Sequence, residues 1–215
     1  MNNLIDNTIL FVKDKLKGAE AGHDWFHMQR VYKNAMLIAN SEQCDLKVVK
    51  LGALLHDIAD SKFNDGDETI GPRVAREFLE SQNATEEIIV HVVNIIENIS
   101  FKGGNFEKKF NSIELQIVQD ADRLDAIGAI GIARTFNYGG FKNRQLYNPE
   151  IAPQLNMSKE EYKNSDAPTL NHFYEKLLLL KDKMNTKTGI KIAQERHKFM
   201  ELFLSQFYAE WDGEV

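Results

Sequence analysis

The chain has 215 residues, of which 43% are hydrophobic and 27% charged, the composition of an ordinary globular protein. Its formal net charge of −6 at pH 7 repels polyanions, so a nucleic-acid polymer is not an expected partner. The one cysteine, Cys44, excludes both an intramolecular disulfide and a thiolate metal cluster.

The sequence also argues against a membrane segment. No stretch reaches the roughly 18 apolar residues that are needed to cross a bilayer. Charged residues, among them Asp6, Lys13 and Asp14, interrupt the first helix-like stretch, which lacks the apolar core and cleavage site of a signal peptide. We therefore expect a cytoplasmic protein with no membrane partner.

Apolar residues recur at steps of three and four along most of the chain, a spacing that predicts α-helices. In chain order the predicted helical stretches lie within residues 27–38, 51–60, 88–99, 117–124, 170–184 and 190–211. The segment Thr85-Glu86-Glu87 before the third stretch is typical of a helix start. The sequence has no sustained alternation of period two and no internal repeat. It predicts an all-α fold of about seven to nine helices.

Two segments interrupt the helical pattern. Residues 101–111 contain Gly103, Gly104 and several lysines, and residues 137–168 contain two glycines and three prolines. A connection of about thirty residues is far longer than the usual four to six, so we expect a functional or mobile loop at 137–168. Because the helix that follows can pack back on the same core, we expect a single domain over residues 1–215.

Two histidines and two carboxylates occupy positions where a polar group is expected near the core. His56 and Asp57 directly follow the apolar run that begins at Leu51. His27 lies on the buried stripe of residues 27–38, and Asp122 interrupts the apolar helical stretch 117–124. A buried carboxylate needs a cation or several hydrogen-bond donors. Two imidazoles and two carboxylates from three helices suit a divalent ion with open coordination positions.

Each of these features has an ordinary structural explanation when it is taken alone. A histidine on an apolar helix face is usually a core residue with satisfied hydrogen bonds. His-Asp pairs arise by chance, and an acidic cluster such as residues 120–125 is more often a solvated helix face. The metal-site hypothesis therefore depends on the combination of the four residues.

At these residues the sequence resembles the HD-domain phosphohydrolases, a superfamily marked by a His, a His-Asp pair and a distant Asp on an all-helical bundle. The matching residues are His27, His56-Asp57 and Asp122. The longer stretches around them, residues 23–31, 56–63 and 120–128, resemble a bacterial subgroup that includes nucleoside-triphosphate pyrophosphohydrolases. The resemblance implies an HD-domain helical bundle and metal-dependent hydrolysis of a phosphate ester or phosphoanhydride in a small nucleotide-like substrate.

The resemblance also bears on the number of metal ions. HD enzymes that hold two metals supply extra histidines between the His-Asp pair and the last Asp, an interval in which this chain has only His91. It therefore implies one divalent ion, which is Mn²⁺, Mg²⁺, Fe²⁺ or Zn²⁺. Glu97 stays open as a substitute ligand.

Residues beside the ligand motifs are candidates for proton transfer and phosphate binding. Asp60, one turn after Asp57, is a candidate for accepting a proton from water, with a polar residue at a helix end as the alternative. His23 and Asp24 are candidates for orienting ligands or donating a proton to a leaving group. Phosphate oxygens favour cationic partners, and the candidates are Lys62, Lys102, Arg30 and Arg123.

Two other functions remain open on the same scaffold. One is a cyclic-nucleotide or dinucleotide phosphodiesterase, which the shortage of additional histidines disfavours. The other is a sensor that binds a metal or a nucleotide without catalysis, which Asp60 and the nearby lysines disfavour. Metal-dependent turnover of a phosphate ester separates an enzyme from a sensor.

Overall fold

The computed structural model describes residues 4–18, 24–59, 67, 69–99, 110–158, 161 and 165–215. These residues form nine α-helices and one 3-10 helix with no strand among them, so the predicted all-α class and helix number are confirmed. The chain divides into two compact units, Met1–Asp122 and Arg123–Val215. That both belong to one domain stays a prediction.

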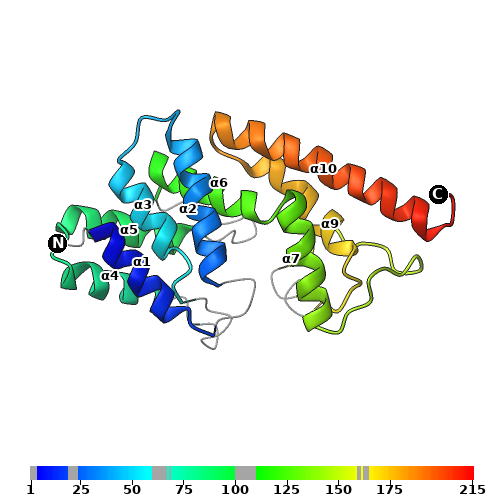
Figure 1. The fold of residues 1–215 in the computed structure, drawn as a ribbon, viewed down its shortest axis with the longest axis horizontal. Helices are drawn as coiled ribbons and strands as arrows, with labels where there is room; N and C mark the ends of the chain where they lie inside the picture. Colours follow the sequence, from blue (N-terminus) through cyan, green and yellow to red (C-terminus); the bar gives the residue numbers. More distant parts are fainter. Residues whose placement is uncertain are drawn as a thin grey trace. The chain divides into compact units, whose positions relative to one another are not determined.

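Helix α3 is the central element of the first unit. It packs against α1, α2 and α5, and Figure 1 shows it among these helices. Seven of its 10 residues are buried, because its sequence is apolar on almost every face. The helices of this unit are α1 (Leu4–Lys15), α2 (Trp25–Ala39), α3 (Leu46–Leu55), α4 (Ile70–Ser81), α5 (Glu86–Asn98) and most of α6 (Ile113–Asp125).

A glycine lets α3 approach its neighbours closely. A Cβ atom at Gly52 would lie 3.2 Å from the Ile95 side chain of α5 and 3.4 Å from that of Val118 of α6. His56 follows Gly52 by four residues, and Asp122 follows Val118 by four residues. One helical turn beyond this contact, the end of α3 therefore meets the end of α6.

The second unit is built around the last helix. It contains α7 (Gly128–Phe141), α9 (Asn171–Glu175), the 3-10 helix η2 (Leu177–Lys183) and α10 (Lys187–Trp211). Helix α10 packs against α7 and η2. Its core is rich in phenylalanine: the rings of Phe173 and Phe203 stack with their centroids 5.8 Å apart, and Phe136 lies 5.9 Å from Phe203.

The structure differs from the predicted elements in two places. The apolar stripe of residues 170–184 is divided between α9 and η2, because the backbone leaves the helical region at Lys176, where φ is −144°. Helix α7 continues through Phe141, so residues 137–141 of the predicted loop are helical. Gly139 is a packing residue there, since a Cβ atom would lie 2.1 Å from Thr169 Oγ1.

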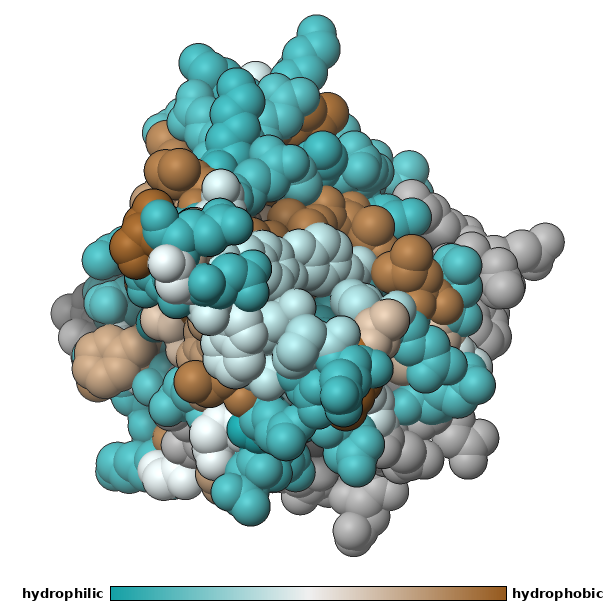
Figure 2. Space-filling model, turned by 90° about the vertical axis from the view of Figure 1, so that its right-hand side faces the viewer, coloured by the Kyte–Doolittle hydropathy of each residue, from teal (hydrophilic) through white to brown (hydrophobic). Residues whose placement is uncertain are grey.

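The surface has the mixed character of most proteins. On the face drawn in Figure 2, apolar side chains lie among hydrophilic ones. Exposed apolar residues of the second unit include Phe141, Leu155 and Trp211, and scattered exposure of this kind is ordinary. Among the described helices, none combines the length and the apolar character that a membrane span requires.

Candidate metal centre

Helix α2 supplies a buried histidine at its first turn. Asp24 is the N-cap of this helix, and its Oδ1 accepts a hydrogen bond of 2.9 Å from the backbone N–H of His27. A carboxylate at this position satisfies a free N–H group and stabilises the positive end of the helix. Asp24, predicted as a catalytic residue, is thus placed where it fixes the backbone of His27, whose side chain is 2% exposed.

The end of α3 supplies the second histidine. His56 is the C-cap of the helix, and its Nδ1 lies 3.0 Å from the carbonyl oxygen of Ala53. This contact requires Nδ1 to carry the proton when the ring is neutral, which leaves the lone pair on Nε2. Nε2 is buried and has no hydrogen-bond partner among the described residues. Such an atom is costly unless something binds it.

Helix α6 brings a carboxylate to both imidazoles. Asp122 Oδ1 lies 3.6 Å from Nε2 of His27 and 3.7 Å from Nε2 of His56. The two rings meet edge to face with their centroids 5.4 Å apart. One donor atom each from His27, His56 and Asp57 lie within 4.8 Å of one another. The structure therefore brings both predicted histidine ligands together with Asp57 in one group and places Asp122 beside both imidazoles.

These distances can be compared with those of a coordinated ion. With ligand bonds of about 2.1 Å, two ligands lie about 3.0 Å apart when adjacent and about 4.2 Å apart when opposite. The separations of 3.6 Å and 3.7 Å between Asp122 Oδ1 and the two imidazole nitrogens lie within this range. Two imidazoles and two carboxylates match the preferences of borderline and hard divalent ions. Together with the buried lone pair of His56, this donor set fits a divalent cation.

The same carboxylates act on the pKa of His56. Burial by itself lowers the pKa of this imidazole, but Asp122 and Asp57 raise it by more. The net pKa of His56 therefore lies above its ordinary value.

The other predicted site residues have varied positions. Arg30 lies half-buried on α2. Arg123 donates a hydrogen bond to the carbonyl oxygen of Lys183, within the second unit. The candidates His23, Asp60, Lys62 and Lys102 lie outside the described residues. The proton-transfer and phosphate-binding roles of these residues stay predictions.

The histidine of the interval between Asp57 and Asp122, His91, and the open substitute ligand, Glu97, lie in other surroundings. His91 Nε2 lies 2.9 Å from Ser112 Oγ and 3.4 Å from a carboxylate oxygen of Glu114. Glu114 in turn accepts a hydrogen bond from the N–H of Asp45, the N-cap of α3. His91 therefore belongs to a network that links α3, α5 and α6, and Glu97 is exposed.

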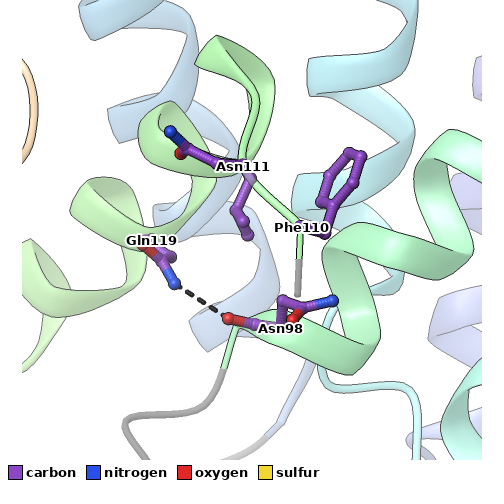
Figure 3. A pocket seen from close by; sticks show the side chains of 5 residues that line it. Asn98, Phe110, Asn111 and Gln119 are labelled. Carbon is purple, nitrogen blue, oxygen red and sulfur yellow. Dashed lines mark hydrogen bonds between the residues drawn. The ribbon is translucent and has the colours of Figure 1, made fainter. Parts of the chain in front are cut away.

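Two side-chain amides, which were not among the predicted site residues, form hydrogen bonds that fix α6 close to Asp122. Gln119 Nε2 donates a hydrogen bond of 2.8 Å to the carbonyl oxygen of Asn98 at the end of α5, as Figure 3 shows. Asn34 Nδ2 donates one of 3.3 Å to the carbonyl oxygen of Ala121. Asn34 follows His27 by seven residues, two helical turns along the same face, and this spacing is the signal that would have found it.

A small pocket opens beside Gln119. It has a volume of about 30 Å³ and is lined by Asn98, Phe110, Asn111, Leu115 and Gln119. Figure 3 shows Gln119 and Asn98 among its lining residues. The volume is sufficient for a water molecule and too small for a nucleobase.

Comparison with known proteins relates this arrangement to a family. Residues 25–127, which include all four predicted ligands, match the HD domain. The chain is 39% identical over 206 residues to the uncharacterized protein YpgQ of Bacillus subtilis, covering 94% of this chain and 91% of that one.

Solved structures resemble the chain over almost its whole length. The crystal structure of an HD-superfamily hydrolase from Bacillus thuringiensis is 44% identical, with a TM-score of 0.77 and coverage of 97% of this chain and 96% of that one. The crystal structure of Bacillus subtilis YpgQ in complex with ADP has 35% identity, a TM-score of 0.75 and coverage of 96% and 97%. The sequence match and the shared fold together lead to one conclusion: the chain belongs to the HD-domain superfamily of hydrolases.

Proposed function

We propose that this chain is a phosphohydrolase that uses one divalent ion, held by His27, His56, Asp57 and Asp122, to cleave a small nucleotide. The observation that carries the proposal is the convergence of these four side chains, with the buried Nε2 of His56 lacking a hydrogen-bond partner among the described residues. The candidate ions are Mn²⁺, Mg²⁺, Fe²⁺ and Zn²⁺.

Each residue of the site has a proposed role in hydrolysis. A divalent ion, when bound, supplies Lewis acidity, which makes a water nucleophilic and offsets the charge that develops on phosphate oxygens. Asp57 and Asp122 balance the charge of the ion, and Ala53 holds the ring of His56 in one orientation. Asp60 is the proposed proton acceptor, and His23 and Asp24 are the proposed residues that orient ligands or donate a proton to the leaving group. Lys62, Lys102, Arg30 and Arg123 are the proposed phosphate partners.

The nature of the substrate is inferred from a relative. Bacillus subtilis YpgQ, which shares the fold over almost its whole length, has been crystallised in complex with ADP. A nucleotide therefore fits the scaffold of a similar protein, and we extend this to the present chain. Within the nucleotides we propose a nucleoside triphosphate, cleaved by water to a nucleoside monophosphate and pyrophosphate.

An assay of a nucleotide panel with product identification tests the proposal. Ribonucleoside and deoxyribonucleoside triphosphates, diphosphates and monophosphates, and cyclic nucleotides, are incubated with Mn²⁺, Mg²⁺, Co²⁺ or Zn²⁺, with EDTA as the control. We expect triphosphates to yield monophosphate and pyrophosphate only when metal is present. Release of inorganic phosphate, or cleavage of cyclic nucleotides alone, would change the proposed reaction. Metal binding without any turnover would instead indicate a sensor.

The affinity for the ion is expected to depend on pH. The pKa of His56 is raised in the metal-free protein, and Nε2 must lose its proton before it can bind an ion. The apparent affinity for Mn²⁺ should therefore increase with pH. Because the pKa is raised, the loss of affinity on acidification should already begin at a pH above the ordinary histidine pKa of about 6.5. Calorimetric titration between about pH 6 and pH 9 measures this trend. A constant affinity over this interval would contradict it.

The stability of the metal-free protein should instead decrease as pH rises. A folded-state pKa above the unfolded value adds stability that is fully present below the unfolded pKa. This stability is lost as pH rises through the raised pKa of His56. Thermal unfolding in EDTA over the same interval provides the comparison.

A further inference from the structure

The C-terminal turn of α6 carries the predicted ligand Asp122 and ends three residues later at Asp125. The last carbonyl groups of a helix have no partner within the helix, and its last turn frays unless other groups bind them. The N–H groups of Ala126 and Ile127 bind the carbonyl oxygens of Arg123 and Leu124, and contacts from other helices can hold this turn, and with it Asp122, more firmly.

Arg196 of α10 provides the first of two such contacts. Its Nη1 donates a hydrogen bond to the carbonyl oxygen of Leu124. Burial lowers the pKa of the guanidinium, and the nearby carboxylate of Asp125 opposes this effect. Arginine stays charged even so, and a cation is favourable at the negative end of a helix.

Arg134 of α7 provides the second contact. Its Nη1 lies 2.6 Å from Asp125 Oδ2 and donates a further hydrogen bond of 3.3 Å to the carbonyl oxygen of Asp125. The side chain of Asp125 is only 2% exposed and that of Arg134 is 23% exposed. A buried pair of this kind is costly to break because the remaining charge stays buried.

Gly128, the first residue of α7, leaves room for the side chain of Arg196. Gly128 has a φ of +75°, a conformation that favours glycine. A Cβ atom there would lie 3.0 Å from Cγ and 3.1 Å from Cβ of Arg196. The stem of Arg196 thus packs directly on Gly128. This gives a structural reason for Asp125 and Gly128 in the stretch of residues 120–128 that contains Asp122.

We propose that Arg196, assisted by Arg134, is a positioning residue for Asp122. The two arginines hold the last turn of α6 through Leu124 and Asp125, and the continuous helix transmits this order to the metal-binding carboxylate. The inference rests on the proposed function in one respect, since it takes Asp122 as a metal ligand. Partners that orient metal ligands typically change metal affinity by about 10- to 100-fold when they are removed.

Metal affinity of the folded protein is the measurement that separates positioning from general stability. Mn²⁺ binding to the full chain is titrated for wild type, Arg196→Gln, Arg196→Lys and the control Arg76→Gln, far below the unfolding temperature of each. Arg76 is a suitable control because it also forms an ion pair, 3.0 Å from Glu86, but joins α4 to α5. Thermal unfolding of each metal-free variant is recorded in parallel.

We expect Arg196→Gln to weaken Mn²⁺ binding by about tenfold or more, and Arg196→Lys to weaken it less, since lysine keeps the charge but lacks the planar fork. Arg76→Gln should leave the affinity unchanged. If Arg196→Gln does not fold, Arg196→Lys decides the question. Wild-type affinity in the Arg196 variants, or an equal loss in Arg76→Gln, would overturn the inference.

Asp122→Asn separates this inference from the proposed function. Loss of Mn²⁺ binding in Asp122→Asn, with unchanged binding in the Arg196 variants, would reject the positioning role and leave the metal site intact. Unchanged binding in Asp122→Asn would instead reject the ligand assignment on which the proposed function rests.

Discussion

Replacement of Asp57 by alanine is expected to abolish metal binding and turnover while the protein keeps its helical fold. Asp57 contributes one of the three donor atoms that lie within 4.8 Å of one another. Its removal leaves His27, His56 and Asp122 with one negative charge against a doubly charged ion. Removal of a metal ligand should weaken binding more than removal of a residue that only orients a ligand. We therefore expect the affinity for the ion to fall by at least about a hundredfold.

Three measurements on the same preparation check this prediction. Mn²⁺ titration reports affinity, circular dichroism reports helix content, and the nucleotide assay reports turnover. The matched control is Asp182→Ala, which removes an exposed aspartate from η2 in the second unit and should behave as wild type. Wild-type turnover in Asp57→Ala would refute the site, and loss of helix content would show that Asp57 has a structural role instead.

Gly131→Ala is expected to cause the largest loss of stability of the changes considered. A Cβ atom at Gly131 would lie 2.2 Å from the carbonyl oxygen of Ala126, and a backbone atom cannot move away at low cost. Substitutions that force backbone shifts in packed regions cost about 1–3 kcal/mol and sometimes more. We place this one at the upper end, at about 3 kcal/mol.

Helix α7 offers a control for this change. Gly140 is exposed and a Cβ atom there meets nothing within 4 Å. Gly140→Ala should raise the free energy of unfolding by about 0.5–1 kcal/mol, because alanine loses less conformational entropy in a helix. Urea unfolding of both variants measures the difference. If the two units unfold in separate transitions, the change in the free energy of unfolding should appear in the transition of the unit Arg123–Val215. Equal stability of the two variants would contradict the prediction.

Much of the fold was predictable because local pattern dominates in long amphipathic helices. The stripes of residues 27–38, 88–99 and 190–211 correspond to α2, α5 and α10. The prediction was wrong where tertiary packing changed local geometry. Steps of three and four do not distinguish an α-helix from the pair of short helices α9 and η2. Gly139 suggested a loop because glycine disfavours helices, but its contact with Thr169 requires a residue without a side chain.

The candidate site was also predictable in part from the sequence. The types and spacing of His27, His56, Asp57 and Asp122, with the resemblance to HD-domain phosphohydrolases, were sufficient to select these four residues. Their convergence depends on packing such as the close approach of α3 to α5 and α6 at Gly52. The proton on Nδ1 of His56 depends on the carbonyl oxygen of Ala53, since only coordinates show where a backbone carbonyl points.

By itself, the sequence determined the helical class, most of the helices and the identity of the predicted ligands, because these depend on residue type and on neighbours within one or two helical turns. Only the tertiary structure revealed that Arg196 meets Leu124, 72 residues earlier, and that Arg134 pairs with Asp125. Contacts at such separations leave no periodic signal, since chain packing rather than local spacing brings their partners together.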